Sequence, residues 1–323
     1  MIKDLIQALL YYFHASWKNH VEVSTSPTRR SKIFNSYFAF CYNFLMKERI
    51  LIIGASSYVG ARLYYDLKQK YDETVGTYNN TKLSDAFLHL DTTKKDEVKK
   101  LINKVHPSRI VHVAANASAK WCEAHPNEAI ALNEEATRAV VEAAKAVDAG
   151  VIFISSFSAM DTSNVYGRTK AESEKSIQEM SRWIILRPSL IIGYSPNTAN
   201  DRPFNRFLKN IDQRTPAVYD TSWKFQPSYL RHISEIIALV IEEGINAQTI
   251  PIAVSDLKSR FDIARDILTK FNIQVTSEDK QDKTSVLKDD LSKLKELGLP
   301  IYRYDEVIKN CIEEIKHRDR FGL

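Results

Sequence analysis

Cysteine is scarce in this sequence, and the few cysteines present are widely separated. Cys41, Cys122 and Cys311 form no CxxC pair, so the sequence indicates neither a disulfide framework nor a zinc site. No apolar run approaches the roughly 20 residues needed to span a bilayer, and no small-residue cleavage site follows the short apolar stretch 5–13. We therefore expect a cytoplasmic protein with no membrane span and no bound metal.

The sequence also has little excess of charge of one sign. The formal net charge is +5. Residues 1–45 hold five basic and two acidic residues, a net +3, which leaves +2 for the rest of the chain. This balance, and the lack of a basic stripe interleaved with aromatics, argues against nucleic-acid binding.

From residue 49 onward, short β-branched or apolar runs alternate with longer helical patterns. The apolar runs are 49–53, 73–77, 109–113, 151–155 and 183–187, and the helical patterns between them are 61–71, 94–105, 126–147 and 166–180. This alternation is typical of βαβ units around a parallel sheet. We predict an α/β fold with a doubly wound parallel sheet (Rossmann-type) and a smaller C-terminal substrate lobe.

The first apolar run leads directly into a glycine turn, Gly54-Ala-Ser-Ser-Tyr-Val-Gly60, where a helical pattern begins. Glycines at this place allow a tight strand-to-helix turn, and the helix N-terminus can then hold a pyrophosphate. A plain strand-to-helix turn is the alternative. The residues predicted to bind a dinucleotide here are Gly54, Ser56, Ser57, Tyr58, Val59 and Gly60.

The end of the second strand, 76–80, contains no acidic residue. An Asp or Glu there would bond the ribose 2′-hydroxyl and repel a 2′-phosphate. NADPH is therefore the expected coenzyme, with Asn79 in its site and NADH as the alternative. Arg62 and Lys82 are candidate phosphate partners, or simply solvated basic residues.

Tyr166 and Lys170 lie four residues apart at the start of a helical pattern, so both project from one face. A nearby ammonium favours the phenolate and makes the phenol a better proton donor to a carbonyl oxygen as hydride arrives. Lys170 can also fix the cofactor ribose. The strand before this helix ends at Ser156, which we predict to hydrogen-bond the same carbonyl, whereas Ser155 on the opposite face would cap the sheet edge. The predicted catalytic residues are Ser156, Tyr166 and Lys170.

With these residues identified, the chain from about residue 46 to its end resembles the extended short-chain dehydrogenases/reductases, and most closely the dTDP-4-dehydrorhamnose reductase-type sugar-nucleotide reductases. The resemblance rests on the segments GASSYVG (54–60), VHVAANASAKWCEAHPNEAIALN (111–133), ISS (154–156), NVYGRTKAESE (164–174), LRPSLIIG (186–193) and FQPSYLRHISEIIALVIEEG (225–244). It implies that Ala114 and Ala115 line the cofactor and that Asp91 lies near the adenine, with a turn or cap as the alternative for Asp91. Positions that recur in the family as structural or cofactor-side residues are Cys122, Glu123 and Asn133.

The sequence departs from the family pattern at three places. Ser57 stands where a third glycine is usual, and Phe157 stands where an Asp often follows the Ser/Thr. Only nine residues separate Ser156 from Tyr166, whereas relatives have a longer loop that helps to cover the substrate. The site could be more open, or its substrate different.

Together these features predict an NAD(P)H-dependent reduction of a keto group on a nucleotide-linked sugar of the 4-keto-6-deoxysugar type. A role in polysaccharide biosynthesis would follow. The alternatives are a sugar-nucleotide epimerase and a non-catalytic NADP-binding regulatory protein of the same fold. Helical segments such as 126–147 and 171–180 could pair in a homodimer. The predicted substrate contacts, each of which could instead be a loop or capping residue, are Arg187, Tyr194, Asn205 and Gln226.

Residues 1–45 resemble none of the units that follow, with ten aromatics, one proline and no glycine. We expect an N-terminal extension outside the working fold, with translation starting at Met46. A membrane-surface anchor or an extra helix that covers the domain are the alternatives. The expected organisation is then the extension, a dinucleotide-binding domain over 46–187, and a substrate-binding lobe over 188–323 that is intertwined with the main domain.

Overall fold

The computed structural model describes residues 48–282, 286 and 288–323. The predictions for residues 1–45 and for a start at Met46 lie outside the described residues. The core of the described part is a parallel seven-stranded sheet with the order β11-β6-β5-β4-β1-β2-β3. Its strands are β1 (Ile50–Ile53), β2 (Thr74–Tyr78), β3 (Leu88–His89), β4 (Arg109–His112), β5 (Gly150–Ile154), β6 (Trp183–Pro188) and β11 (Gln248–Ile252). The predicted doubly wound sheet is confirmed.

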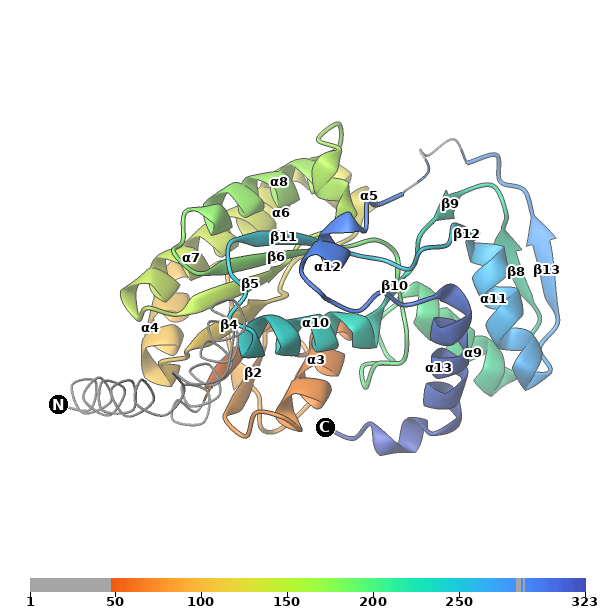
Figure 1. Cartoon of the computed structure of the whole chain (residues 1–323), viewed down its shortest axis with the longest axis horizontal. Coiled ribbons are helices and arrows are strands. Elements are labelled where there is room, and N and C mark those ends of the chain that lie inside the picture. Colours follow the sequence, from red (N-terminus) through yellow and green to blue (C-terminus); the bar gives the residue numbers. More distant parts are fainter. Residues whose placement is uncertain (1–47, 283–285, 287) are drawn as a thin grey trace, which may run out of the picture. The chain divides into compact units, whose positions relative to one another are not determined.

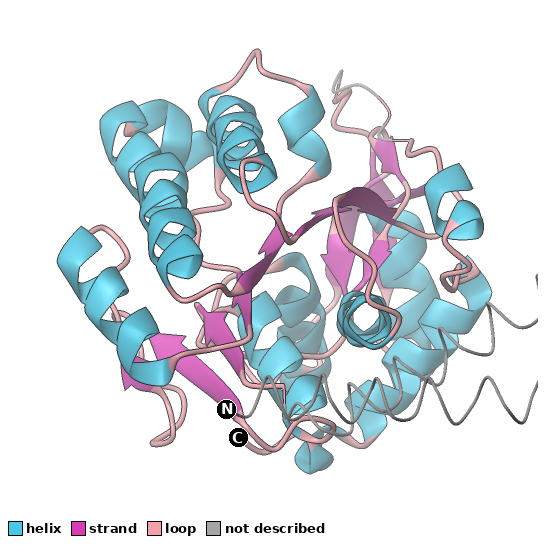
Figure 2. Cartoon of the chain, turned by 60° about the vertical axis from the view of Figure 1, so that its left-hand side comes forward, coloured by secondary structure: helices cyan, strands magenta, loops and turns pink. Residues whose placement is uncertain are grey.

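Helices cover both faces of this sheet (Figures 1 and 2). Successive strand residues point to opposite faces, so Ile50 and Ile52 of β1 join the core on one side, and Leu51 and Ile53 join the core on the other. Because both faces are buried, the strands are continuously apolar rather than alternating. The first core includes α3 (Tyr58–Lys68) and α10 (Leu230–Glu242), and the second includes α4 (Lys95–Val105), α7 (Ala136–Ala146) and α8 (Val165–Gln178).

The short strand β3 was not among the five predicted strands, and neither was β11. β11 pairs with β6 at the edge of the sheet, and α10 comes before it in the chain. Its sequence, QTIPI, contains Pro251, which lacks a backbone N–H and is tolerated in a strand mainly at an edge. The interval 188–323 therefore supplies one strand and one helix to the main sheet as well as a separate lobe.

The predicted helix 126–147 is interrupted. It consists of α6 (Pro126–Ala129), a π-helical turn (Ile130–Glu135) and α7, and α5 (Ala119–Ala124) comes before it. The π turn holds Asn133, whose Oδ1 accepts from the Asn116 amide at 2.8 Å and whose Nδ2 donates to the Thr169 hydroxyl at 3.2 Å. The turn thus ties the segment after β4 to α8, the helix that carries Tyr166 and Lys170.

The smaller lobe contains short elements beside the sheet (Figure 1). Three two-stranded sheets form within it, β10-β7, β12-β9 and β13-β8. Its strands and helices are β7 (Ile191–Ile192), α9 (Pro203–Gln213), β8 (Ala217–Asp220), β9 (Lys224–Phe225), β10 (Ser228–Tyr229), β12 (Lys258–Ser259), α11 (Arg260–Leu268), β13 (Val275–Glu278), α12 (Ser292–Glu296) and α13 (Tyr304–Lys316). None of the helices in the described part of the chain has the length and apolar character that a membrane span requires.

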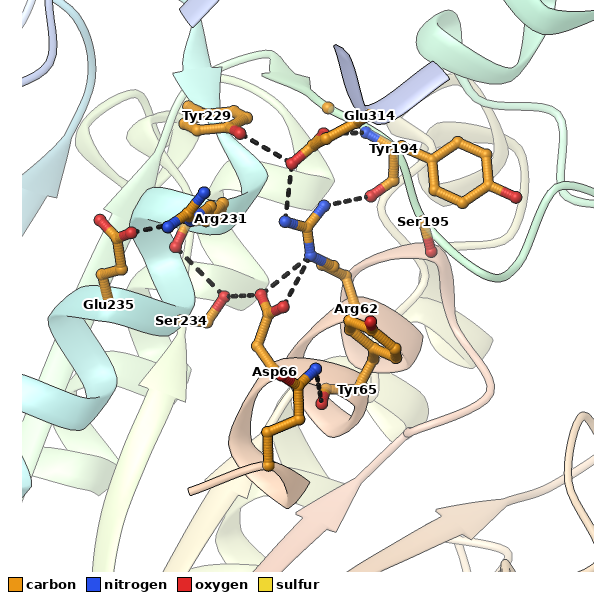
Figure 3. A network of polar contacts seen from close by, with 12 residues as sticks. Arg62, Tyr65, Asp66, Tyr194, Ser195, Tyr229, Arg231, Ser234, Glu235 and Glu314 are labelled. Atoms are coloured by element: carbon orange, nitrogen blue, oxygen red, sulfur yellow. Dashed lines mark hydrogen bonds and ion pairs between the residues drawn. The ribbon is translucent and has the colours of Figure 1, made fainter. Parts of the chain in front are cut away.

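A buried polar network centred on Arg62 joins α13 to α3 (Figure 3). The Arg62 guanidinium donates to Asp66 at 2.9 Å, to Glu314 at 2.7 Å and to the carbonyl of Tyr194 at 2.7 Å. Glu314 also accepts from the Tyr229 hydroxyl at 2.7 Å and from the Tyr194 amide at 2.9 Å. Because every partner is a strong hydrogen-bonding group, the charge of Arg62 is compensated inside the protein.

This network corrects two predictions. Arg62 is not a phosphate partner, because it is 2% exposed and its guanidinium is held by two carboxylates. Tyr194 is not a substrate contact, because its backbone belongs to the same network and its ring packs on Phe321. Both residues fasten the C-terminal helix to the main domain.

We predict that Glu314→Gln lowers the free energy of unfolding by about 3 kcal/mol, because it removes one of the two carboxylates that compensate the buried Arg62 charge. Urea denaturation measures the change. The control is Glu313→Gln, whose side chain is 51% exposed beside Lys316 and should change stability by less than about 0.5 kcal/mol. Equal effects of the two substitutions would show that the network does not hold α13.

Candidate functional site

A cleft of about 260 Å³ opens at the carboxyl ends of the central strands. Four of these strands, β1, β4, β5 and β6, lead directly into it, and the smaller lobe closes its far side. This is the edge at which open α/β sheets bind ligands. The lining residues are Ser57, Tyr58, Val59, Val113, Ala115, Ala117, Ile154, Ser155, Ser156, Phe157, Ser158, Tyr166, Lys170, Pro188, Ser189, Leu190, Ile191, Arg202, Pro203 and Trp223.

The glycine turn brings the N-terminus of α3 to one end of the cleft. Gly54 has φ of +91°, and a Cβ there would lie 2.8 Å from the amide nitrogen of Ala114. A Cβ on Gly60 would lie 2.1 Å from the carbonyl oxygen of Gly54. Ser57, in place of a third glycine, caps α3 by accepting from the Gly60 amide at 3.0 Å. The turn therefore needs glycine at 54 and 60, and serine at 57 fits it.

Two other residues of the turn, Ser56 and Tyr58, form hydrogen bonds with the segment that follows β7. The Tyr58 phenol donates to the carbonyl oxygen of Gly193 and is 3% exposed. The carbonyl oxygen of Ser56 accepts from the Asn197 side chain at 2.6 Å. These contacts fasten the turn to the segment after β7, so Tyr58 can offer a ligand little more than its backbone and ring.

The three predicted catalytic residues meet in the middle of the cleft. Ser156 is the second residue after β5, and Tyr166 and Lys170 lie on consecutive turns of α8. Lys170 is 2% exposed; its Nζ donates to the carbonyl oxygen of Ile154 at 2.8 Å and lies 4.0 Å from the centre of the Phe153 ring. The arrangement places a phenol, a hydroxyl and an amine side by side at the end of β5.

Burial shifts the pKa of both titratable groups away from their ordinary values. It raises the pKa of Tyr166, while the Ser156 hydroxyl and the Arg202 charge act to lower it. Burial also lowers the pKa of Lys170 to about 7, and the negative charge of Glu174 opposes that change. A lysine that titrates near neutral pH inside a cleft is typical of a functional site.

The predicted adenosine-side residues lie along the edge formed by β2 and β3. Asn79 is exposed directly after β2, and Lys82 pairs with Asp85 at 2.7 Å. Asp91 follows β3, and its carboxylate accepts from the amide and the hydroxyl of Thr93 at 3.0 and 2.7 Å. Asp91 thus forms the turn that was the alternative for it, and its role toward an adenine stays a prediction.

The other three predicted substrate contacts make structural contacts instead. Arg187 forms a bidentate ion pair with Glu174 and does not line the cleft. Asn205 is 1% exposed and donates to the carbonyl oxygens of residues 197 and 200. Gln226 is 3% exposed and bridges the backbone of residues 255 and 289. Asn205 and Gln226 are buried polar side chains whose partners hold loops together, and Arg187, which is 26% exposed, is held by Glu174. Substrate contact by these three residues stays a prediction that their observed contacts do not support.

Sequence reasoning missed Arg202, which reaches the cleft from the smaller lobe. Arg202 is the N-cap residue of α9, and the next residue, Pro203, is a usual residue for the first helical turn. The signal in the sequence was an Arg-Pro pair after a polar stretch, but nothing local indicated that the helix would begin at the cleft. Among the described residues that line the cleft, Arg202 and Lys170 are the cations and no carboxylate is present.

No group of three or more His, Cys, Asp or Glu side chains that could hold a metal ion occurs within residues 48–282 and 288–323. Cys122 and Cys311 are both buried, and neither is paired. The polar groups in the cleft are hydroxyls, the Lys170 amine and the Arg202 guanidinium.

Comparison with known proteins agrees with this geometry. The methionine adenosyltransferase 2 subunit beta of Bos taurus is 30% identical over 145 residues, which are 41% of this chain and 43% of that protein. A dTDP-4-dehydrorhamnose reductase of Aggregatibacter actinomycetemcomitans is 27% identical over 218 residues, 62% of this chain and 70% of that protein. The matched region thus spans less than half of the length of the first of these relatives.

A similar fold is seen in the crystal structure of the dTDP-4-dehydrorhamnose reductase of Bacillus anthracis in complex with NADP. The TM-score is 0.70 at 20% identity, covering 83% of this chain and 100% of that one. The family described as the RmlD substrate binding domain matches residues 48–315, which is nearly all of the described chain. The chain belongs to the RmlD substrate binding domain family.

Proposed function

We propose that this protein is an NAD(P)H-dependent reductase that acts on a keto group of a nucleotide-linked sugar, of the 4-keto-6-deoxysugar type. The observation that carries the proposal is the convergence of Ser156, Tyr166 and Lys170 in the cleft that the α3 N-terminus enters. Tyr166 gives a proton to the carbonyl oxygen, and Ser156 donates a hydrogen bond to it. Lys170 supports the developing negative charge from the next turn of α8.

The glycine turn is the proposed site of the coenzyme pyrophosphate, because Gly54 and Gly60 keep the backbone bare where a Cβ would clash. The reduced nicotinamide supplies the hydride when it is bound. Val59, Ala114 and Ala115 would line the coenzyme, the ring of Tyr166 would contact it, and Lys170 would hold its ribose. The neutral Asn79 at the end of β2 favours NADPH over NADH, and the complex of the Bacillus anthracis protein with NADP supports the same choice.

A nucleotide-linked sugar carries a diphosphate, and the cleft suits an anion. Its described lining has two cations and no carboxylate, and Lys170 is already bonded to Ile154. We assign the substrate diphosphate to Arg202, whose guanidinium forms no ion pair within the described chain. The apolar surfaces of Pro188 and Trp223 would contact the sugar or the base.

A second candidate function is that of a non-catalytic subunit. It is favoured by the similarity to proteins named methionine adenosyltransferase 2 subunit beta, and the short segment between Ser156 and Tyr166 suits it as well. The full set of Ser156, Tyr166 and Lys170 weighs in favour of the reductase.

NADPH oxidation in the presence of dTDP-, UDP- and GDP-linked keto sugars tests the proposal. The reductase predicts oxidation with at least one of them and none with the free sugars, since Arg202 would lack its diphosphate. Tight NADPH binding without oxidation across the whole panel would favour the subunit.

We predict that Tyr166→Phe lowers the rate of hydride transfer by at least ~100-fold, the effect of losing a positioned general acid. The affinity for NADPH should remain within a factor of about two, because the ring is kept. Single-turnover measurements of NADPH consumption check the rate. The control, Tyr219→Phe, removes a hydroxyl that lies outside the cleft near Asn210 and should leave the rate unchanged. Wild-type turnover by Tyr166→Phe would exclude Tyr166 as the proton donor.

Calorimetric titration should show tighter binding of NADPH than of NADH. The reason is that no carboxylate follows β2 to repel the 2′-phosphate. Asn79→Asp should reverse the preference by introducing that charge, and Asn80→Asp, one residue further on, serves as the control. A wild-type protein that prefers NADH would overturn the assignment.

NADPH affinity should fall as the pH rises above about 7. The free protein has a Lys170 pKa of about 7, and a bound polyanion raises it, so below that pH the ammonium is present before and after binding. Above it, binding must take up a proton, and the affinity declines. Titrations between pH 6 and about 9 in buffers of different ionisation enthalpy measure this uptake. Lys170→Met should bind weakly with no such pH dependence, and a wild-type affinity that is independent of pH would contradict the prediction.

A further inference from the structure

One face of α8 carries three polar residues at successive turns, and the function proposed above uses only two of them. Tyr166, Lys170 and Glu174 are spaced by four residues, so they lie above one another on the helix. Glu174 is 5% exposed, although a carboxylate is rarely buried without strong partners. Its partners are Ser155, the residue directly after β5, and Arg187 on β6.

Glu174 is fully engaged. Its Oε1 accepts from the Ser155 hydroxyl at 2.5 Å and from Arg187 Nε at 2.9 Å, and its Oε2 accepts from Arg187 Nη2 at 2.5 Å. The amide of Ser155 also donates to the carbonyl oxygen of Leu186 at 2.8 Å. The bidentate guanidinium geometry fixes the carboxylate plane, and charge-assisted bonds of this kind are the strong ones.

Three consecutive residues at the end of β5 therefore meet α8 in different ways. The carbonyl of Ile154 accepts from Lys170, and the side chain of Ser155 donates to Glu174. The Ser156 hydroxyl lines the cleft; it accepts from the Ser158 amide at 3.1 Å and keeps its own proton to donate. Side chains alternate along an extended segment. Fixing the side chain of Ser155 on one side consequently sets where Ser156 points on the other.

We propose that Glu174 is a positioning residue for this site: by holding Ser155 and Arg187 it fixes the Ser156 hydroxyl relative to Tyr166 and supports the charge of Lys170. The inference rests on the proposed function only for the identity of the reaction. It assigns to Arg187 the role of holding the Glu174 carboxylate in place, whereas the sequence indicated a substrate contact.

The charged and titratable groups around Lys170 act on its ammonium in different ways. Glu174 is the carboxylate that favours the ammonium. His112, from β4, is fully buried, and burial lowers its pKa to about 3, so it is neutral at physiological pH. Tyr166 lies one turn away and is neutral until its raised pKa is reached. On the far side of Glu174, Arg187 also faces the half-buried Asp289, whose pKa burial raises to about 6.

Glu174→Gln separates this role from a purely structural one. The variant keeps the size of the side chain and one acceptor for Ser155, but it removes the charge. Lys170 should then lose its proton at a pH lower by on the order of one unit, the effect of losing a nearby opposite charge. NMR titration of protein labelled with 13C-lysine follows the proton directly, with the Lys170 signal assigned by its absence in Lys170→Met. The pH at which NADPH affinity begins to fall should move by the same amount.

Three further variants complete the test. Glu174→Asp keeps the charge and should restore the Lys170 titration close to that of the wild type. Ser155→Ala removes the hydroxyl alone and should lower turnover without moving that titration. Glu172→Gln changes an exposed carboxylate on the same helix, 46% exposed beside Lys175, and should change neither.

A Glu174→Gln protein that melts at a lower temperature but keeps the wild-type Lys170 titration and NADPH profile would make Glu174 a structural ion pair and overturn the inference. If that variant fails to fold, wild-type turnover by Ser155→Ala overturns it instead. Failure of the wild type to bind NADPH would refute the proposed function, and the NMR titration would still decide the role of Glu174.

Discussion

The packing of one face of α8 against the end of β5 is the contact on which the site depends. The carbonyl of Ile154 is held by Lys170 and the side chain of Ser155 by Glu174, and this leaves Ser156 and Tyr166 to share the cleft. Glu174 is in turn held by Arg187 on β6, so two strands and one helix fix each other's register. A parallel sheet brings these strand ends to one edge. The four-residue spacing of Tyr166, Lys170 and Glu174 on α8 then places three polar side chains against that edge.

A second buried network secures the opposite side of the cleft. Arg62 and Glu314 join α3 to α13 (Figure 3), and the Tyr58 phenol and the Asn197 amide fasten the glycine turn to the segment that follows β7. Residues from the C-terminal half of the chain therefore hold both α3 and the glycine turn that leads into it. The N-terminus of α3 faces the cleft as a consequence.

Much of the fold and part of the site could be predicted from the sequence, because their signals are local. Apolar runs marked five strands, and the spacing of Tyr166, Lys170 and the Ser156 strand end marked the centre of the cleft.

β11 was missed because Pro251 contradicts a strand pattern unless the strand lies at an edge. α13 was missed although its apolar residues do follow a helical period. Arg62 was misassigned because its partner Glu314 lies 252 residues away in the sequence, and no local pattern shows that a polar side chain is buried. Arg202 was missed for a related reason, since only the tertiary fold brings the start of α9 to the cleft.

The transfer of deuterium from NADPH labelled at C4 of the nicotinamide to a nucleotide-linked keto sugar tests the central claim most directly. A reductase with Tyr166 as its proton donor predicts a sugar product one mass unit heavier than that formed from unlabelled NADPH, and the label should sit on the former carbonyl carbon. Firm binding of the labelled coenzyme with no deuterium in any sugar, under conditions in which a dTDP-4-dehydrorhamnose reductase transfers it, would contradict the claim. The protein would then be a coenzyme-binding subunit.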